Sequence, residues 1–250
     1  MKTVIALLTF SLLMISCGEA PKPLLTANEI VTRAIDSTGG DLYKKAHIAF
    51  DFRNMHYESI RNHGFYEYSR TQTDSLSNAI QDIIGTDGYR RLINGAPVQV
   101  IDSMANKYSN SVNSVHYFAY LPYGLNDKAV QKTLLDDVKI KEVEYYKIKV
   151  TFTQEGGGED FEDVFLYWID KKDFSVDYLA YLYHTDGGGI RFREAFNVRR
   201  IGGIRFSDYH NLKPASEDIN LFTIDSLFTS GSLEKLSEIE LKNITVKPVE

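Results

Sequence analysis

Alternating apolar and polar residues dominate the chain after its first forty positions. Residues 48–52 and 146–153 place apolar side chains at every second position, with polar side chains between them. This period of two predicts strands that bury one face and expose the other to water. Further strands of this kind are predicted over residues 65–73, 89–94, 98–102 and 204–211.

Two segments are apolar on both faces. Residues 164–169 read Val-Phe-Leu-Tyr-Trp-Ile, and residues 178–183 read Tyr-Leu-Ala-Tyr-Leu-Tyr. A strand with two apolar faces needs a cover on each of them. We expect the second cover to be either helices of the chain or a bound apolar ligand. Glycine runs at 156–158 and 187–189 predict hairpin loops after strands 146–153 and 176–185.

Two other segments have helical periodicity. Thr26 and Glu29 form a capping box before the apolar face of residues 27–38, and Gly39 ends that segment. A second helix is predicted over residues 110–121, with Pro122 directly after it. We expect this second helix to lie over the sheet as a lid.

The predicted fold is mainly β, of the α+β type. It is a single curved antiparallel sheet, or half-barrel, of about ten strands with an N-terminal helix and a mid-chain helical lid. Residues 26–250 contain no convincing linker and no internal repeat. We therefore expect them to form one β-rich domain.

The first residues are predicted to be a targeting segment. Lys2 precedes an apolar run of about a dozen residues that ends at Ile15. A membrane-spanning helix needs roughly 20 apolar residues, so this run fits the core of a signal peptide instead. We assign residues 1–16 to the signal peptide and the proline-containing residues 17–25 to a tether.

The end of this segment, Met14-Ile15-Ser16-Cys17-Gly18, resembles the bacterial lipobox. Met14 departs from the usual leucine, and Ile15 is bulkier than usual. The resemblance implies cleavage before Cys17, lipid attachment to that cysteine and a membrane as partner. The expected location is the cell envelope, at the outer membrane, with its periplasmic or surface side left open. The alternative is an ordinary secretory signal with an incidental cysteine.

Charge and motifs exclude several classes of function. The formal net charge is −6 with both signs spread along the chain, which argues against nucleic acid as a partner. We expect no cofactor and no metal, because the six histidines lack metal-ligand spacing. An acidic cluster could form a calcium site, but a solvated cluster is the favoured interpretation. It consists of Glu159, Asp160, Glu162 and Asp163.

The order of these elements resembles the lipoprotein-carrier superfamily (LolA/LolB-like). Residues 27–40, Ala-Asn-Glu-Ile-Val-Thr-Arg-Ala-Ile-Asp-Ser-Thr-Gly-Gly, are the closest local match. Residues 112–118 and 191–194 are similar to an uncharacterised group of bacterial lipoproteins. The superfamily resemblance implies a half-open barrel with an apolar interior, covered by helices, that binds acyl chains. It fixes no individual lipid-contacting residue.

Candidate ligand-binding residues come from the lid helix, from the strands with two apolar faces and from the strand at 190–199. On that last strand we place Phe192, Glu194 and Phe196 on one face, with Arg193 on the other. The full candidate set is His116, Tyr117, Tyr120, Tyr167, Trp168, Tyr181 and Glu194.

Each candidate has a structural alternative. His116 fits a core histidine better than a general base, Glu194 fits an ion pair better than a pocket carboxylate, and the lid helix can be a plain core helix. We expect a membrane-anchored binding protein for a lipid or other apolar ligand, without chemistry and with no protein partner identified. The alternatives are an enzyme with an unrecognised site near His116 and Glu194, or an envelope interaction protein with a filled core.

Overall fold

The computed structural model describes residues 24–155, 161–216 and 219–249. The predicted signal peptide, the lipid-attachment residue Cys17, most of the tether, and Glu159 and Asp160 of the acidic cluster lie outside the described residues.

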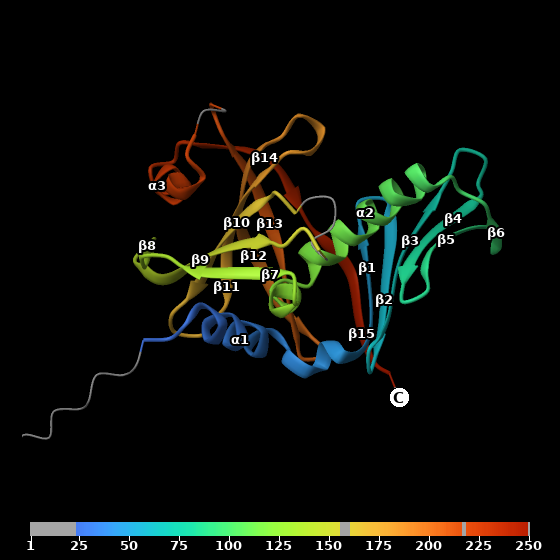
Figure 1. Cartoon of the computed structure of the whole chain (residues 1–250), viewed down its shortest axis with the longest axis horizontal. Helices are drawn as coiled ribbons and strands as arrows, with labels where there is room; N and C mark the ends of the chain where they lie inside the picture. The colour runs from blue at the N-terminus through green and yellow to red at the C-terminus, as the bar shows by residue number, and fades with distance from the viewer. Residues whose placement is uncertain (1–23, 156–160, 217–218, 250) are drawn as a thin grey trace, which may run out of the picture.

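The strands form two antiparallel sheets of seven and eight strands (Figure 1). The seven-stranded sheet has the order β15-β1-β2-β3-β4-β5-β6, and the eight-stranded sheet has the order β14-β13-β12-β11-β10-β9-β7 with β8 on β9. The first sheet contains β1 (Lys45–Phe52), β2 (Met55–Asn62), β3 (Phe65–Thr73), β4 (Ala79–Gly85), β5 (Gly88–Ile93), β6 (Ala96–Val98) and β15 (Leu241–Pro248). The second contains β7 (Val130–Leu134), β8 (Val138–Ile140), β9 (Val143–Phe152), β10 (Val164–Asp170), β11 (Val176–Tyr183), β12 (Gly189–Ile201), β13 (Ile204–Pro214) and β14 (Leu233–Ile239).

The two sheets meet where β14 ends and β15 begins. Only Glu240 separates these strands, and the chain passes there from its pairing with β13 to its pairing with β1. The Leu241 amide donates to Asp208 at 2.9 Å, and the Leu241 carbonyl accepts from Arg199 at 2.6 Å. These bonds connect the sheets through a continuous segment. The expected mainly β, antiparallel fold with an N-terminal helix and a mid-chain helix is confirmed, but its strands form two sheets rather than the single sheet predicted, because the chain changes partner at Glu240.

The described residues form fifteen strands rather than about ten. The strands that the sequence reading missed include β2, β4, β7 and β8. In β2, β4 and β7, polar residues interrupt the apolar alternation, and β8 has only three residues, so pairing with neighbouring strands determines these strands instead.

The N-terminal helix α1 (Ala27–Thr38) has the predicted bounds. The Glu29 amide donates to Thr26 Oγ1 at 3.2 Å, and the Thr26 amide donates to Glu29 Oε2 at 2.8 Å, which completes the capping box. Gly39 follows with φ of 151°, a conformation that favours glycine, and ends the helix.

The mid-chain helix α2 (Asp102–Ala119) begins eight residues before the predicted start at 110 and replaces the end of the strand predicted over 98–102. Its first half carries few apolar residues and is largely exposed, so it shows no apolar face in the sequence. Short helical segments complete the fold. These are η1 (Gly40–Lys44), η2 (Tyr123–Asn126), η3 (Thr185–Gly187), η4 (Leu221–Thr223) and α3 (Ile224–Thr229). Within the described residues, no helix combines the length and apolarity needed to cross a bilayer.

Strands β10 and β11 bury both faces, as their sequences require. We call the face that carries Tyr167 and Leu179 the inner face; it packs against α1, including Ile30 and Val31. We call the opposite face, which carries Leu166 and Trp168, the outer face; it packs against Leu221 and Ile224 of η4 and α3.

This packing corrects one premise of the sequence reading. Leu166, Trp168 and Leu179 are fully buried by the chain's own side chains, so the two apolar faces of β10 and β11 require no bound ligand. The prediction left open whether helices or a ligand cover the second face. The structure shows that η4 and α3 cover it. A function in ligand binding must therefore rest on another feature.

Candidate functional site

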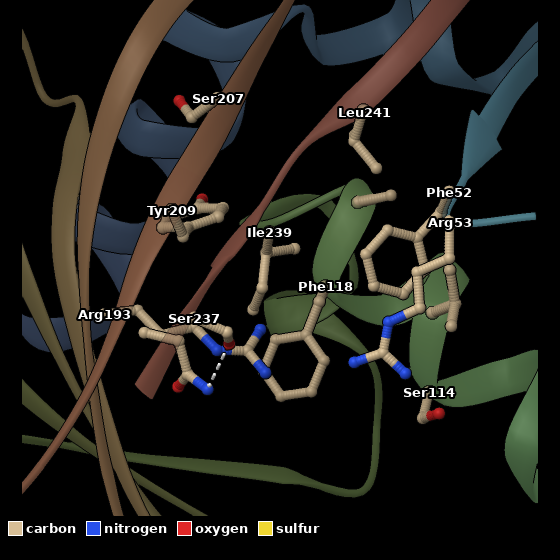
Figure 2. A pocket seen from close by; sticks show the side chains of 13 residues that line it. Phe52, Arg53, Ser114, Phe118, Arg193, Ser207, Tyr209, Ser237, Ile239 and Leu241 are labelled. Atoms are coloured by element: carbon tan, nitrogen blue, oxygen red, sulfur yellow. Dashed lines mark hydrogen bonds between the residues drawn. The ribbon is translucent and has the colours of Figure 1, made fainter. Parts of the chain in front are cut away.

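A cavity of about 220 Å³ lies between α2 and the inner face of the eight-stranded sheet (Figure 2). Larger hollows beside Phe222 and Lys139 are open grooves in the surface. The cavity combines aliphatic, aromatic and polar side chains from three parts of the chain. They are Phe52 at the end of β1 and Arg53 after it, then Ser114, Val115, Phe118 and Ala119 of α2, and Arg193, Ser207, Tyr209, Asn211, Ser237, Ile239 and Leu241 of β12 to β15.

Strand register places the polar lining in one row. Leu179 lies opposite Arg193, Arg193 opposite Asn211, and Asn211 opposite Ser237, across four neighbouring strands. Directly opposed residues in an antiparallel sheet point to the same face. The guanidinium, the amide and the hydroxyl therefore face the cavity together, and Asn211 Nδ2 donates to Ser237 Oγ at 3.2 Å (Figure 2).

Arg193 is the most unusual residue of this row, because only 7% of its surface is exposed. One guanidinium nitrogen donates to the Tyr181 hydroxyl at 2.9 Å, and the guanidinium carbon lies 3.8 Å from the centre of the Phe118 ring. Its Nε is buried without a hydrogen-bond partner. Among the described residues, no carboxylate lies within 4.0 Å of the guanidinium, so this buried cation has no counter-ion.

Phe118 lines the cavity and also contacts the aromatic cluster behind its wall. Its ring centre lies 5.5 Å from that of Tyr181 and 6.5 Å from that of Phe165. In the view of Figure 2, Phe118 lies between Arg193 and the exposed Arg53 at the other side of the cavity. Such a site offers apolar contact and a cationic group side by side, which suits a molecule with one apolar and one acidic part.

The family model for the family of unknown function DUF6503 matches residues 3–241. The chain belongs to this family. No curated protein matches the sequence.

Three solved structures have a similar fold. A LolA superfamily protein, NE2245 from Nitrosomonas europaea, is 11% identical, with 91% of this chain and 94% of that chain covered and a TM-score of 0.45. A putative outer membrane lipoprotein-sorting protein domain from Vibrio parahaemolyticus is 9% identical, with 88% and 91% covered and a TM-score of 0.45. A DUF1329 family protein from Desulfovibrio piger is 8% identical, with 88% and 92% covered and a TM-score of 0.39. The first belongs to the superfamily that the sequence resembles.

Within this DUF6503 chain, none of the seven candidate residues named from the sequence lines the cavity directly. Tyr181 comes closest, since its hydroxyl accepts the hydrogen bond from Arg193. Tyr117 and Tyr167 pack beside it on the inner face, with their hydroxyl oxygens 2.8 Å apart. Burial raises the pKa of both phenols above its usual range, so both remain protonated.

His116 and Tyr120 belong to the core between α2 and the seven-stranded sheet. His116 Nε2 donates to the Ser69 carbonyl at 3.1 Å, and Nδ1 lies 3.2 Å from the Tyr120 hydroxyl. Tyr120 in turn donates to Ser59 at 2.8 Å. Burial lowers the pKa of His116 to about 3, so the ring is neutral, with Nε2 carrying the proton that it donates to Ser69. This is the core histidine that the sequence reading favoured.

Trp168 and Glu194 lie on the outer face, away from the cavity. Trp168 Nε1 donates to Asp225 at 3.2 Å. Glu194 forms an ion pair with Lys141 at 2.6 Å, which is the structural role favoured for it in the sequence reading. These two residues therefore stabilise the fold and make no contact with the cavity lining.

The residue that the sequence reading missed is Arg193. Alternation separated it from Phe192 and Glu194, and that separation holds. The face with phenylalanines was taken as the covered one, whereas both faces are covered at this position. A pairing irregularity between Phe196 and Arg199 shifts the register, so Val198 is 51% exposed and Arg199 reaches Asp208. The four arginines of β12 were the available signal, but the sequence does not show which of them is buried without a carboxylate.

Two of the four acidic-cluster residues are described. Glu162 is exposed, and the buried Asp163 accepts from the His184 amide at 3.3 Å. Within the described ranges, no group of three or more metal-ligating residues comes together. The observed role of Asp163 is to hold the chain at the end of β11.

Proposed function

We propose that the protein is an envelope-anchored binding protein that holds a small amphiphilic or apolar molecule in the cavity, without chemistry. The observation that carries this proposal is the cavity itself, because its wall combines Val115, Phe118, Ile239 and Leu241 with a few polar groups. Ligand sites in proteins commonly have this composition.

The size of the cavity limits the ligand. Its volume of about 220 Å³ is smaller than the roughly 300–1,000 Å³ of common small-molecule sites. A single short alkyl chain with a compact headgroup suits this space, whereas a lipid with several acyl chains does not. We therefore propose a single-chain ligand rather than an intact diacyl lipid.

Filling the cavity tests the proposal. Val115→Trp places a large ring in the cavity wall, and Asn113→Trp adds the same ring on the exposed side of α2 as a matched control. Isothermal titration calorimetry with decanoate and with decan-1-ol should show binding to the wild type and to Asn113→Trp. We expect the affinity of Val115→Trp to be lower by at least about tenfold, since an overfilled site excludes the chain.

A second function is favoured by one observation, the burial of both faces of β10 and of the first half of β11 by the chain's own side chains. It is an envelope interaction protein with a filled core. Absence of binding of both decanoate and decan-1-ol to the wild type would reject the ligand-binding proposal and favour this alternative.

The anchor is proposed from the lipobox resemblance at Cys17. Several acyl chains give durable membrane attachment, whereas one chain gives only marginal binding. Cys17→Ser is expected to abolish palmitate labelling and to move the protein out of the outer-membrane fraction, with Ser16→Ala as a small-residue control. A Cys17→Ser protein that still takes up label would reject the anchor.

A further inference from the structure

We infer that Arg193 is the binding site for an acidic headgroup, so that the cavity's ligand is a single-chain amphiphile ending in a carboxylate or a phosphate. This inference rests on the proposed function and names its ligand class. An isolated cation is costly to bury, and buried charges in proteins are normally paired. Arg193 is only 7% exposed, and it lines the cavity. None of the described carboxylates lies within 4.0 Å of its guanidinium.

Other shielded arginines of the chain form ion pairs with carboxylates. Arg70 and Arg91 both pair with Asp82 at 2.7 Å, Arg199 pairs with Asp208 at 2.9 Å, and Arg205 pairs with Asp177 at 3.1 Å. All four have side chains no more than 24% exposed. Arg61 and Arg191 have no such carboxylate among the described residues, but both are only half-buried. The two fully buried arginines are Arg70 and Arg193, and Arg193 differs from Arg70 by pairing with a neutral hydroxyl instead of a carboxylate.

The surroundings of Arg193 favour an oxyanion. The face of the guanidinium lies on the Phe118 ring, with 3.8 Å between the guanidinium carbon and the ring centre, which leaves the N–H edge for a ligand. Nε has no partner, and Tyr181 accepts from only one of the terminal nitrogens. Guanidinium groups bind carboxylate and phosphate oxygens through paired N–H donors.

Asn211 adds a second unused polar atom to the site. It lies opposite Arg193 in the strand register, and its Oδ1 is buried without a partner. An acceptor beside the cationic donor suits a headgroup that also carries a hydroxyl or an acidic proton. Val115, Phe118 and Ile239 provide apolar contact for the alkyl chain in the same cavity.

The experiment compares three ligands that share one alkyl chain: decanoate, decyl phosphate and the uncharged decan-1-ol. Calorimetry on the wild type should show at least one anion binding about 10- to 100-fold more tightly than the alcohol, the range expected for a charge-assisted hydrogen bond. The tighter of the two anions identifies the headgroup as carboxylate or phosphate.

Arg193→Gln should remove this anion preference while the alcohol still binds within about threefold of wild type. Arg193→Lys keeps the charge and should restore part of the preference. Arg191→Gln is the matched control. Arg191 lies two residues away on β12, donates to the Tyr183 hydroxyl at 2.6 Å and does not line the cavity. Its variant should keep the wild-type preference.

The outcomes separate the two proposals. Equal binding of all three ligands to the wild type, or an anion preference that survives in Arg193→Gln, would overturn the headgroup site and leave the proposed function standing. If none of the three ligands binds to the wild type, the proposed function is overturned as well. Thermal unfolding of each variant shows whether it is folded. If Arg193→Gln is unfolded, the anion preference of Arg193→Lys is compared with that of the wild type instead.

Discussion

Lys147 and Arg193 are buried cations on opposite faces of the same sheet, with 6% and 7% of their surfaces exposed. Lys147 projects from β9 on the outer face, opposite Trp168 in the register. Arg193 projects from β12 on the inner face, opposite Leu179. The two positions have similar burial, but their surroundings differ.

The buried cation of the outer face has a carboxylate partner, whereas the buried cation of the inner face has none among the described residues. Lys147 Nζ donates to Asp225 at 2.6 Å and to the Phe222 carbonyl at 2.7 Å, and both partners belong to η4 and α3. Arg193 has one neutral acceptor and an aromatic ring. The difference indicates that the chain itself pairs the charge of Lys147, whereas the charge of Arg193 is left for the proposed ligand.

Removing the partner of Lys147 should give the largest effect. Asp225→Ala leaves a buried ammonium without its carboxylate, so we expect the free energy of unfolding to fall by about 3–5 kcal/mol. Urea denaturation followed by circular dichroism measures this loss. Glu234→Ala removes an exposed acid 3.6 Å from Lys213 and should cost no more than about 1 kcal/mol. If Asp225→Ala loses no more stability than the Glu234→Ala control, water solvates Lys147 and the ion pair does not stabilise the fold.

His116 offers a third kind of buried group, one that stays neutral. Its pKa falls from 6.5 to about 3 in the folded state because burial disfavours the charged ring. The unfolded chain binds a proton below pH 6.5 and the folded chain does not, so this contribution to stability is complete above pH 6.5 and is lost as the pH falls toward 3.

We expect His116 to contribute a loss of about 1.4 kcal/mol per pH unit between pH 6 and pH 4. Urea denaturation of His116→Gln over this range should show a shallower pH dependence than wild type. His63→Asn, a change at an exposed turn position with φ of 45°, should leave the slope unchanged. Identical slopes for wild type and His116→Gln would show that His116 is protonated in the folded protein.

The smallest effect is expected at Arg193, whose charge has no carboxylate partner among the described residues. Arg193→Met keeps apolar volume beside Phe118 and removes an unpaired buried cation, so the free energy of unfolding should change by less than about 1 kcal/mol, or increase. Urea midpoints at constant m-value measure it. A loss comparable to that of Asp225→Ala would make Arg193 a structural residue and remove the contrast between the two faces.

Local sequence signals predicted the elements that local chemistry determines. The capping box and Gly39 set both ends of α1, and residues 65–73 form β3 as the alternation indicates. The start of α2 was missed because residues 102–109 lack an apolar face. Its position depends on contacts such as Ser111 with Arg70, 41 residues earlier in the chain.

The sequence by itself determined that the chain is rich in antiparallel strands, that two of them need cover on both faces, and that its N-terminus resembles a lipoprotein signal. These properties follow from the order of side chains along one segment at a time. Only the tertiary structure decided that η4 and α3 cover the outer face, that Asp225 reaches Lys147, and that none of the described carboxylates pairs with Arg193. Partners 78 residues apart in the sequence, as Lys147 and Asp225 are, become neighbours through sheet register and chain reversal, which no local pattern encodes.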